Sequence, residues 1–395
     1  MIKEENITSE QEVYFRLVDW LKQHWLPLPD TDKLIPIVRA AFTPEEASLL
    51  IGIPFSGRNL EELAEIKQMD PAELRQRLDA LAKKGAVFRT VEGNTIKYSI
   101  KGANFILNRA NFWSGRADER TKTMAPLANQ YYSHVWDVYK HTHHKVLRVL
   151  PIEATIKDTR QILPYEEVAK VLDTKEYFSV TTCACRHRKN LTHDLPSCKY
   201  STENCLHFDR LAHYIVENDL GREITREEAH EILRKSAEEG LVHGLDNYQK
   251  GAETICNCCQ CCCVFFQAYH KLGHAEGMVP SNYRVRPNPE LCIGCGLCVK
   301  RCPMNALHLE GSAEAKNRIT KVTDEKGKAK ELKNKTGQVV VLEPKRCIGC
   351  GVCAYKCSTQ SLVLERRKVI THPPKDEREY VDLVVADFKC RSKRG

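Results

Sequence analysis

The sulfur atoms of two nearly identical segments near the C-terminus could carry redox chemistry. Both have the spacing C-x2-C-x2-C-x3-C. Three cysteines spaced in this way can reach three corners of a 4Fe–4S cube, and a fourth thiolate from elsewhere completes the set. The pattern therefore predicts one-electron transfer. The first run holds Cys292, Cys295, Cys298 and Cys302, and the second run holds Cys347, Cys350, Cys353 and Cys357.

These runs resemble the bacterial two-cluster ferredoxin family over about residues 284–368. In that family the last cysteine of each run serves the other cluster. The resemblance implies one cluster on Cys292, Cys295, Cys298 and Cys357, and a second on Cys347, Cys350, Cys353 and Cys302. Two features depart from the family pattern: Ser358 replaces the proline that usually follows the fourth cysteine, and the spacer between the runs is long. Paired C-x2-C motifs also bind zinc, but two identical runs of four cysteines favour clusters.

Glycines within the two runs are expected to adopt positive φ, which lets the loop bring backbone N–H groups close to the sulfurs. Such donors stabilise the reduced, more negative cluster. Ile293 and Ile348 are placed to keep water away from it. The glycines are Gly294, Gly296, Gly349 and Gly351.

A first upstream set of cysteines has the pattern C-x-C-x12-C-x6-C. Its four soft ligands could close a further Fe–S cluster or a zinc site, and redox-active thiols are the remaining interpretation. The basic run from Arg186 to Lys189 beside them would offset the negative charge of an iron–thiolate centre. The set consists of Cys183, Cys185, Cys198 and Cys205.

A second upstream set places six cysteines in eight residues, and neighbouring thiols cannot all point the same way. They are therefore expected to serve more than one centre or face, either as cluster ligands or as a reactive dithiol. Cys183 and Cys185 could share a cluster with some of them. From Ile162 to about Leu364 the chain resembles multi-cluster ferredoxin-domain proteins, which implies one or two clusters besides the ferredoxin pair. The six are Cys256, Cys258, Cys259, Cys261, Cys262 and Cys263.

Length and composition predict a multidomain chain whose cysteines bind metal in a reducing compartment. Its 395 residues are enough for two or three domains. No apolar run is long enough to span a bilayer, and the N-terminus lacks a secretory pattern. Nineteen cysteines without such a signal predict a reducing cytosol, in which cysteines serve as metal ligands, and favour an anaerobic cell. The net charge of +8 does not by itself indicate nucleic acid.

Residues 43–100 resemble a winged helix-turn-helix. Thr43 to Glu46 form a capping-box sequence that begins a helix. Asp70-Pro71 begins another, because Asp is a favourable N-cap and Pro is favoured at the first helical position. Two strands with a turn at Gly93-Asn94 follow. The segment holds eight Lys or Arg against nine Asp or Glu. DNA affinity needs a basic surface, so this balance favours a structural or docking role over DNA binding.

Together these patterns predict an α+β chain with a winged-helix-like domain at 1–103, a helical cysteine-rich region at 104–283, a two-cluster ferredoxin domain at 284–368 and a tail at 369–395. No nucleotide-binding loop or catalytic triad is found. We therefore expect an electron-transfer protein or oxidoreductase subunit rather than a stand-alone enzyme.

The partner is expected to be a redox protein or oxidoreductase complex. It would dock through the winged-helix domain or through a basic hairpin at 311–338, which holds eight Lys or Arg against four Asp or Glu. Two alternatives stay open: a redox- or iron-responsive DNA-binding regulator, and an enzyme that acts on thiols or disulfides at Cys256–Cys263.

Overall fold

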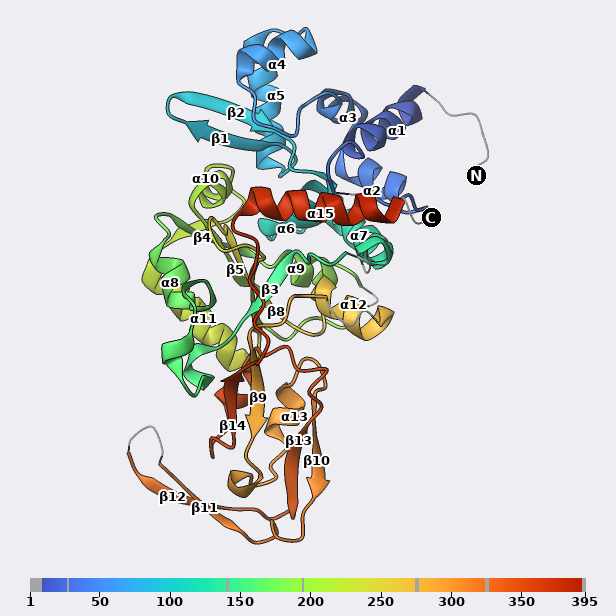
Figure 1. Ribbon diagram of the computed structural model, residues 1–395. Coiled ribbons are helices and arrows are strands. Elements are labelled where there is room, and N and C mark those ends of the chain that lie inside the picture. Colours follow the sequence, from blue (N-terminus) through green and yellow to red (C-terminus); the bar gives the residue numbers. More distant parts are fainter. Residues whose placement is uncertain are drawn as a thin grey trace. The chain divides into compact units, whose positions relative to one another are not determined.

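The computed structural model describes residues 9–26, 28–139, 142–193, 195–273, 277–323 and 327–392. The chain divides into two compact units, each built from separate stretches of sequence (Figure 1). The expected middle region 104–283 contributes to both. Unit 1 comprises Met1–His144, Glu176–Thr225 and Val381–Gly395, and unit 2 comprises Lys145–Lys175 and Arg226–Tyr380.

Unit 1 begins with helices that bury one apolar face each, such as Leu34, Ile37, Val38 and Ala41 of α2. Its helices are α1 (Ser9–Leu21), α2 (Leu34–Ala41), α3 (Pro44–Leu50), α4 (Leu60–Lys67), α5 (Pro71–Lys83), a π-helical turn (Phe105–Arg109), α6 (Ala110–Trp113), α7 (Glu119–Tyr139), α9 (Ala184–Asn190) and α10 (Asp209–Glu217). Its strands are β1 (Phe88–Glu92), β2 (Thr95–Ser99), β4 (Phe178–Thr182), β5 (Glu203–Phe208) and β6 (Arg222–Ile224).

Residues 43–100 form three helices followed by an antiparallel hairpin, as the sequence predicts. The capping box is present at the start of α3: Thr43 accepts from the Glu46 N–H, and Glu46 accepts from the Thr43 N–H. Asp70 caps α5 by accepting hydrogen bonds from the N–H groups of Ala72 and Glu73. Strands β1 and β2 pair from Phe88–Ser99 to Glu92–Thr95, which leaves Gly93 and Asn94 as the turn.

The middle of the chain is less helical than the sequence predicts. In unit 1, β4 pairs antiparallel with both β5 and β6. Strand β4 reads Phe-Ser-Val-Thr-Thr, and its β-branched residues favour a buried strand. The short length of such strands gives them little periodicity in the sequence.

Unit 2 also mixes strands and helices. Its helices are α8 (Val168–Asp173), α11 (Arg226–Glu239), α12 (Val264–Leu272), α13 (Leu297–Arg301) and α14 (Val352–Tyr355). Its strands are β3 (Leu147–Leu150), β7 (Val242–Asp246), β8 (Thr254–Cys258), β9 (Tyr283–Pro287), β10 (Leu307–Gly311), β11 (Ile319–Thr323), β12 (Ala329–Lys333), β13 (Gln338–Leu342) and β14 (Leu362–Arg366). Helix α15 covers Glu377–Ser392.

Three antiparallel pairs shape the C-terminal half of unit 2. Strand β9 pairs with β14 and β10 pairs with β13, while α13 and α14 follow the two cysteine loops (Figure 1). The spacer between the cysteine runs forms the predicted hairpin, β11 with β12. Strands β3, β7 and β8 make a further antiparallel set.

One arginine ties this half of unit 2 to helix α11. Arg301, the last residue of α13, donates to the carbonyls of Ala237 at 2.8 Å and Glu238 at 3.0 Å, and to that of Val352 at 3.2 Å. The last carbonyls of a helix lack partners within the helix, and a cation there also complements the helix dipole. Arg301 therefore fixes both short helices that follow the cysteine loops. Within the described ranges, no helix has the length and apolar character needed to cross a membrane.

Candidate functional site

The two ferredoxin-type loops adopt the backbone that their glycines predict. Gly294, Gly296, Gly349 and Gly351 have φ values of 65°, 72°, 71° and 83°. This left-handed conformation is easily reached only by glycine. The N–H of Gly294 donates to the Sγ of Cys292 at 3.4 Å, so the predicted amide-to-sulfur contact is present in the first loop.

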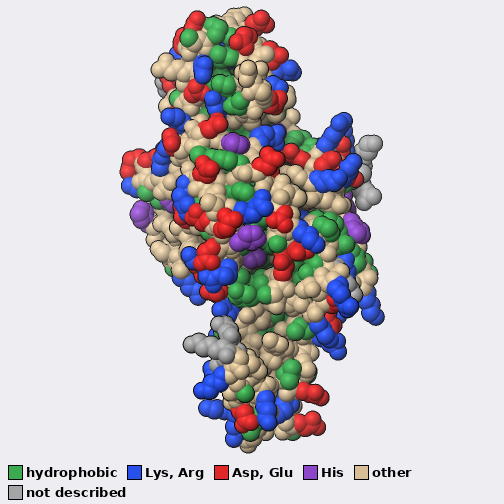
Figure 2. Space-filling view, turned by 90° about the vertical axis from the view of Figure 1, so that its left-hand side faces the viewer, with side chains coloured by type: hydrophobic (Ala, Val, Ile, Leu, Met, Phe, Trp, Pro, Cys, Tyr) green, Lys and Arg blue, Asp and Glu red, His purple; other side chains and the backbone are tan. Residues whose placement is uncertain are grey.

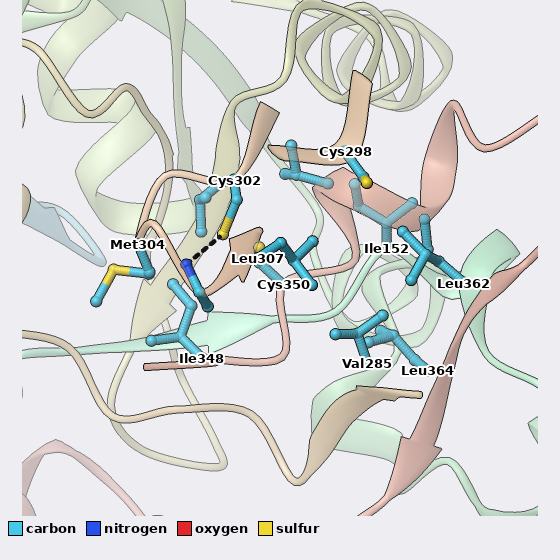
Figure 3. Close-up of a cluster of buried hydrophobic side chains, with 14 of the residues drawn as sticks. Ile152, Val285, Cys298, Cys302, Met304, Leu307, Ile348, Cys350, Leu362 and Leu364 are labelled. Atoms are coloured by element: carbon cyan, nitrogen blue, oxygen red, sulfur yellow. Dashed lines mark hydrogen bonds between the residues drawn. The ribbon is translucent and has the colours of Figure 1, made fainter. Parts of the chain in front are cut away.

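The last cysteine of the first run lies with three cysteines of the second run. Cys302, Cys347, Cys350 and Cys353 line one hollow, together with apolar residues that include Val285, Leu307, Ile348 and Leu364. Figure 3 shows Cys302 and Cys350 close together, with Leu307 and Ile348 beside them. Ile348 is buried and lines this hollow beside the cysteines.

The other four cysteines of the pair interact electrostatically. Burial, followed by the charges of Cys357, Cys295 and Cys292, raises the pKa of the Cys298 thiol to about 12. Cys357, from the second run, therefore lies near Cys298 of the first run. Cys295 is the exposed member of this group, while Cys292 and Cys298 are buried.

Polar groups outside the motifs also reach the sulfurs. The N–H of Ala306 donates to Cys302 Sγ at 3.2 Å, drawn as a dashed line in Figure 3. The hydroxyls of Ser361 and Thr359 lie 3.4 and 3.7 Å from Cys357 Sγ. Burial acts to raise the pKa of Cys357, but hydrogen bonds from these two residues lower it overall.

These donors were not predicted. The one signal in the sequence was Ser358, which begins a polar stretch where a proline was expected. Arg367 is a further residue near the cysteines that the sequence analysis did not identify. Its guanidinium donates to the carbonyls of Cys347 at 2.5 Å and Ser281 at 3.0 Å. It places a positive charge beside the second cysteine loop.

The six upstream cysteines of unit 2 fall into two groups. The Sγ atoms of Cys259, Cys261 and Cys262 lie within 4.8 Å of one another. Cys258 instead interacts with Cys256 and Cys263: hydrogen bonds with their thiols, together with burial, raise its pKa. The structure therefore separates the neighbouring thiols of Cys258 and Cys259, as the argument from adjacency predicts.

The first upstream set lies in unit 1 on several elements. Cys183 precedes α9, Cys185 is in its first turn, Cys205 is in β5, and the N–H of Cys198 donates to Asn190 at 2.9 Å. Among the side chains that the structure describes, no three of these four sulfurs lie within 4.8 Å of one another.

Two of the basic residues beside that set, Arg186 and Arg188, are buried. Arg186 is 0% exposed and donates to the oxygens of Asn204 at 2.6 Å and Ser201 at 2.8 Å. Arg188 is 2% exposed and donates to Asn129 at 2.7 Å. Burying two cations is costly unless negative charge lies near them.

Comparison with known proteins matches the C-terminal segment. The family described as "4Fe-4S dicluster domain" matches residues 291–361. "Ferredoxin-3" of Rhodobacter capsulatus is 33% identical over 79 residues, which cover 20% of this chain and 76% of that protein. "Ferredoxin-3" of a Nostoc species is 36% identical over 66 residues, 17% of this chain and 61% of that protein.

A larger relative is "Pyruvate-flavodoxin oxidoreductase" of Rhodospirillum rubrum. It is 33% identical over 91 residues, which cover 22% of this chain but 8% of that protein. No solved structure gives a match. The similarity to known proteins is therefore carried by about a fifth of the chain.

Proposed function

We propose that the chain passes single electrons through two clusters to a partner oxidoreductase. Through residues 291–361 it belongs to the ferredoxins with a 4Fe–4S dicluster domain, and this membership is the basis of the proposal. The observation that carries this proposal is the hollow in which Cys302 meets Cys347, Cys350 and Cys353. Four thiolates on one apolar hollow suit a cube with an all-cysteine ligand set.

We assign one cluster to Cys292, Cys295, Cys298 and Cys357, and the other to Cys347, Cys350, Cys353 and Cys302. The clusters would supply the one-electron chemistry. The protein would hold them by thiolates, exclude water with side chains such as Ile348, and stabilise added negative charge with backbone and hydroxyl donors. Ligation by cysteine alone favours potentials in the negative part of the known range.

Paired alanine substitutions test the crossed assignment. If Cys302 and Cys350 serve one cluster, then C302A, C350A and the double variant each lose about four irons. C302A combined with C295A should lose about eight irons, because those residues serve different clusters. If the C302A and C295A double variant loses only about four irons, while the C302A and C350A double variant loses about eight, the crossed ligand sets are refuted.

The basic hairpin is the surface proposed for the partner. Its base is bonded to the first cysteine loop: Asn334 donates to the Cys292 carbonyl at 3.0 Å, and Arg318 donates to the same oxygen at 3.2 Å. Cys295 of that loop is exposed. Lys and Arg side chains gather at the lower end of the face in Figure 2, where β11 and β12 lie in Figure 1.

An acidic partner on this hairpin would dock beside the first cluster. Since one relative is a pyruvate-flavodoxin oxidoreductase, a flavodoxin is a suitable probe. Reversing the exposed charges Lys333 and Lys335 to Glu should lower the rate of electron transfer at low salt, and the difference should shrink as salt rises. Lys235 of α11, changed to Glu, is the matched control. Equal rates for both variants would exclude docking at the hairpin.

A DNA-binding regulator is the second candidate, because α3, α4, α5 and the β1–β2 hairpin follow one another as in a winged helix. In a winged helix the helix before the hairpin, here α5, would read the DNA, but its cations are close to acidic groups. Arg75 lies 3.8 Å from Asp79 and Arg77 lies 2.6 Å from Glu73. Such pairs reduce the charge available for phosphates. Promoter binding in a gel shift, specific to one cluster state, would favour the regulator.

The remaining assignments follow from the same reasoning. We propose that the upstream cysteines are ligands of further metal, supported in unit 1 by the buried cations Arg186 and Arg188. We also propose that the chain works in the cytoplasm of an anaerobic cell, since thiolate–iron sites need reducing conditions. Cell fractionation would test the cytoplasmic location, and growth of the source cell with and without oxygen would test whether it is an anaerobe.

A further inference from the structure

The turn between β8 and α12 gathers three sulfur atoms of unit 2. The N–H of Cys263 donates to the Cys259 carbonyl at 3.2 Å and closes the turn. Cys259 and Cys262 are 3% and 6% exposed. Cys261 Sγ lies 3.6 Å from Cys259 Sγ and 3.6 Å from Cys262 Sγ. A single turn of backbone thus presents three thiols to one point.

The size of this group suits one ion rather than a cube. Zinc binds thiolates at about 2.3 Å in a tetrahedron, which places neighbouring sulfurs about 3.8 Å apart. The three sulfurs lie within 4.8 Å of one another, whereas no three of the eight ferredoxin-type sulfurs, all in the described part of the chain, form such a group. The iron-binding loops hold their thiols farther apart, as four irons and four sulfides require.

The charge of the group also favours a metal ion. As neutral thiols, the three would make only weak hydrogen bonds, because S–H is a poor donor. As thiolates, three negative charges at this separation would repel one another strongly in a largely buried site. A divalent cation between them removes the repulsion. Among common metals, a tetrahedral site rich in thiolate selects zinc, or iron bound as a single ion.

We propose that Cys259, Cys261 and Cys262 are three ligands of one tetrahedral zinc ion that is separate from the ferredoxin-type clusters. The ion has a structural role, since zinc does not change its redox state. The chain would then move electrons through two clusters alone, and this inference concerns a site outside the proposed electron path.

Helix α12 gives the ion a mechanical connection to the second cluster. The helix begins directly after the turn, at Val264. His270 Nε2 lies 2.7 Å from the Pro303 carbonyl, and the Tyr269 hydroxyl donates to the Met304 carbonyl at 3.5 Å. Pro303 and Met304 follow Cys302, a proposed ligand of that cluster. An ion that fixes the turn also fixes the start of the helix that braces this segment.

The native full-length chain provides the first test. After anaerobic purification we expect about eight irons, at least one zinc per chain, and zinc-edge X-ray absorption that shows sulfur at about 2.3 Å. Twelve or more irons without zinc would overturn the inference, as would eight irons without zinc. Either result would leave the two-cluster proposal intact. Failure of the zinc inference can therefore be distinguished from failure of the proposed function.

Variants locate the ion. C261A should lose about one zinc and keep its iron, and C350A should lose about four irons and keep zinc. Cys390 belongs to none of the three cysteine sets, so C390S is the cysteine control and should keep both metals. Loss of iron with unchanged zinc in C261A would overturn the assignment. Alkylation of the native chain needs no folded variant: Cys261 should react with iodoacetamide only after zinc is chelated, and reaction with zinc still bound would overturn it.

Discussion

The hydroxyl of Ser361 should raise the reduction potential of the cluster that we assign to Cys357. Ser361 is 3% exposed, and its Oγ lies 3.4 Å from Cys357 Sγ. Because a ligating sulfur is a thiolate, the hydroxyl donates. A reduced cluster carries one more negative charge than an oxidised one, so the donor stabilises the reduced state more. Replacing Ser361 by Ala should therefore make the cluster harder to reduce.

The size of the shift follows from the strength of this bond. A hydrogen bond to a charged group contributes about 1.5–3 kcal/mol. Both oxidation states of the cluster accept the bond, so the difference between them is a fraction of this, about 0.5–1.5 kcal/mol. For a one-electron couple, 59 mV corresponds to about 1.4 kcal/mol. The potential in Ser361→Ala should thus fall by about 20–60 mV.

A redox titration followed by EPR measures this shift. Thr359→Val removes the more distant hydroxyl, 3.7 Å from the sulfur, and should lower the potential by a smaller amount. Ser358→Ala removes the exposed neighbouring hydroxyl and is the control, with the parent potential. The reasoning is refuted if Ser361→Ala raises the potential, or if Ser358→Ala shifts it equally.

Three further predictions concern single residues. Gly349→Ala should lose about four irons, because a Cβ at its φ of 71° would meet the Tyr283 carbonyl, whereas Gly93→Ala, with nothing within 4 Å, should keep all its iron. Thr43→Ala removes the α3 capping box and should lower the free energy of unfolding by about 1 kcal/mol, measured by urea denaturation. Burial, with the charge of Lys101, lowers the pKa of His24 from 6.5 to about 4, so the unfolded chain binds more protons in this window. Stability should therefore fall as pH drops from 6.5 to 4, and His24→Asn should remove this slope in urea titrations.

The C-terminal site was largely predictable because its chemistry dictates local spacing. The cysteine runs required glycines at positive φ, and Gly294, Gly296, Gly349 and Gly351 have it. The β1–β2 turn at Gly93-Asn94 and the Thr43 capping box also follow from short-range rules. These features depend on contacts within a few residues, which a sequence records directly.

The rest of the architecture depends on contacts that sequence spacing does not record. Strand β4 is five residues long and pairs with β5 and β6, which lie beyond a cysteine-rich loop and a helix. Arg301 and Arg367 are bonded to backbone carbonyls far along the chain. Nothing in an arginine's own neighbourhood identifies such partners. The division of Cys256–Cys263 into two groups likewise depends on the turn before α12.

The most direct test of the central claim is a joint iron, sulfide and EPR measurement on the chain purified without oxygen. Electron transfer through two clusters predicts about eight irons and eight acid-labile sulfides, and reduced spectra of two 4Fe–4S centres that interact magnetically. A colourless preparation that holds zinc but neither iron nor sulfide would contradict it.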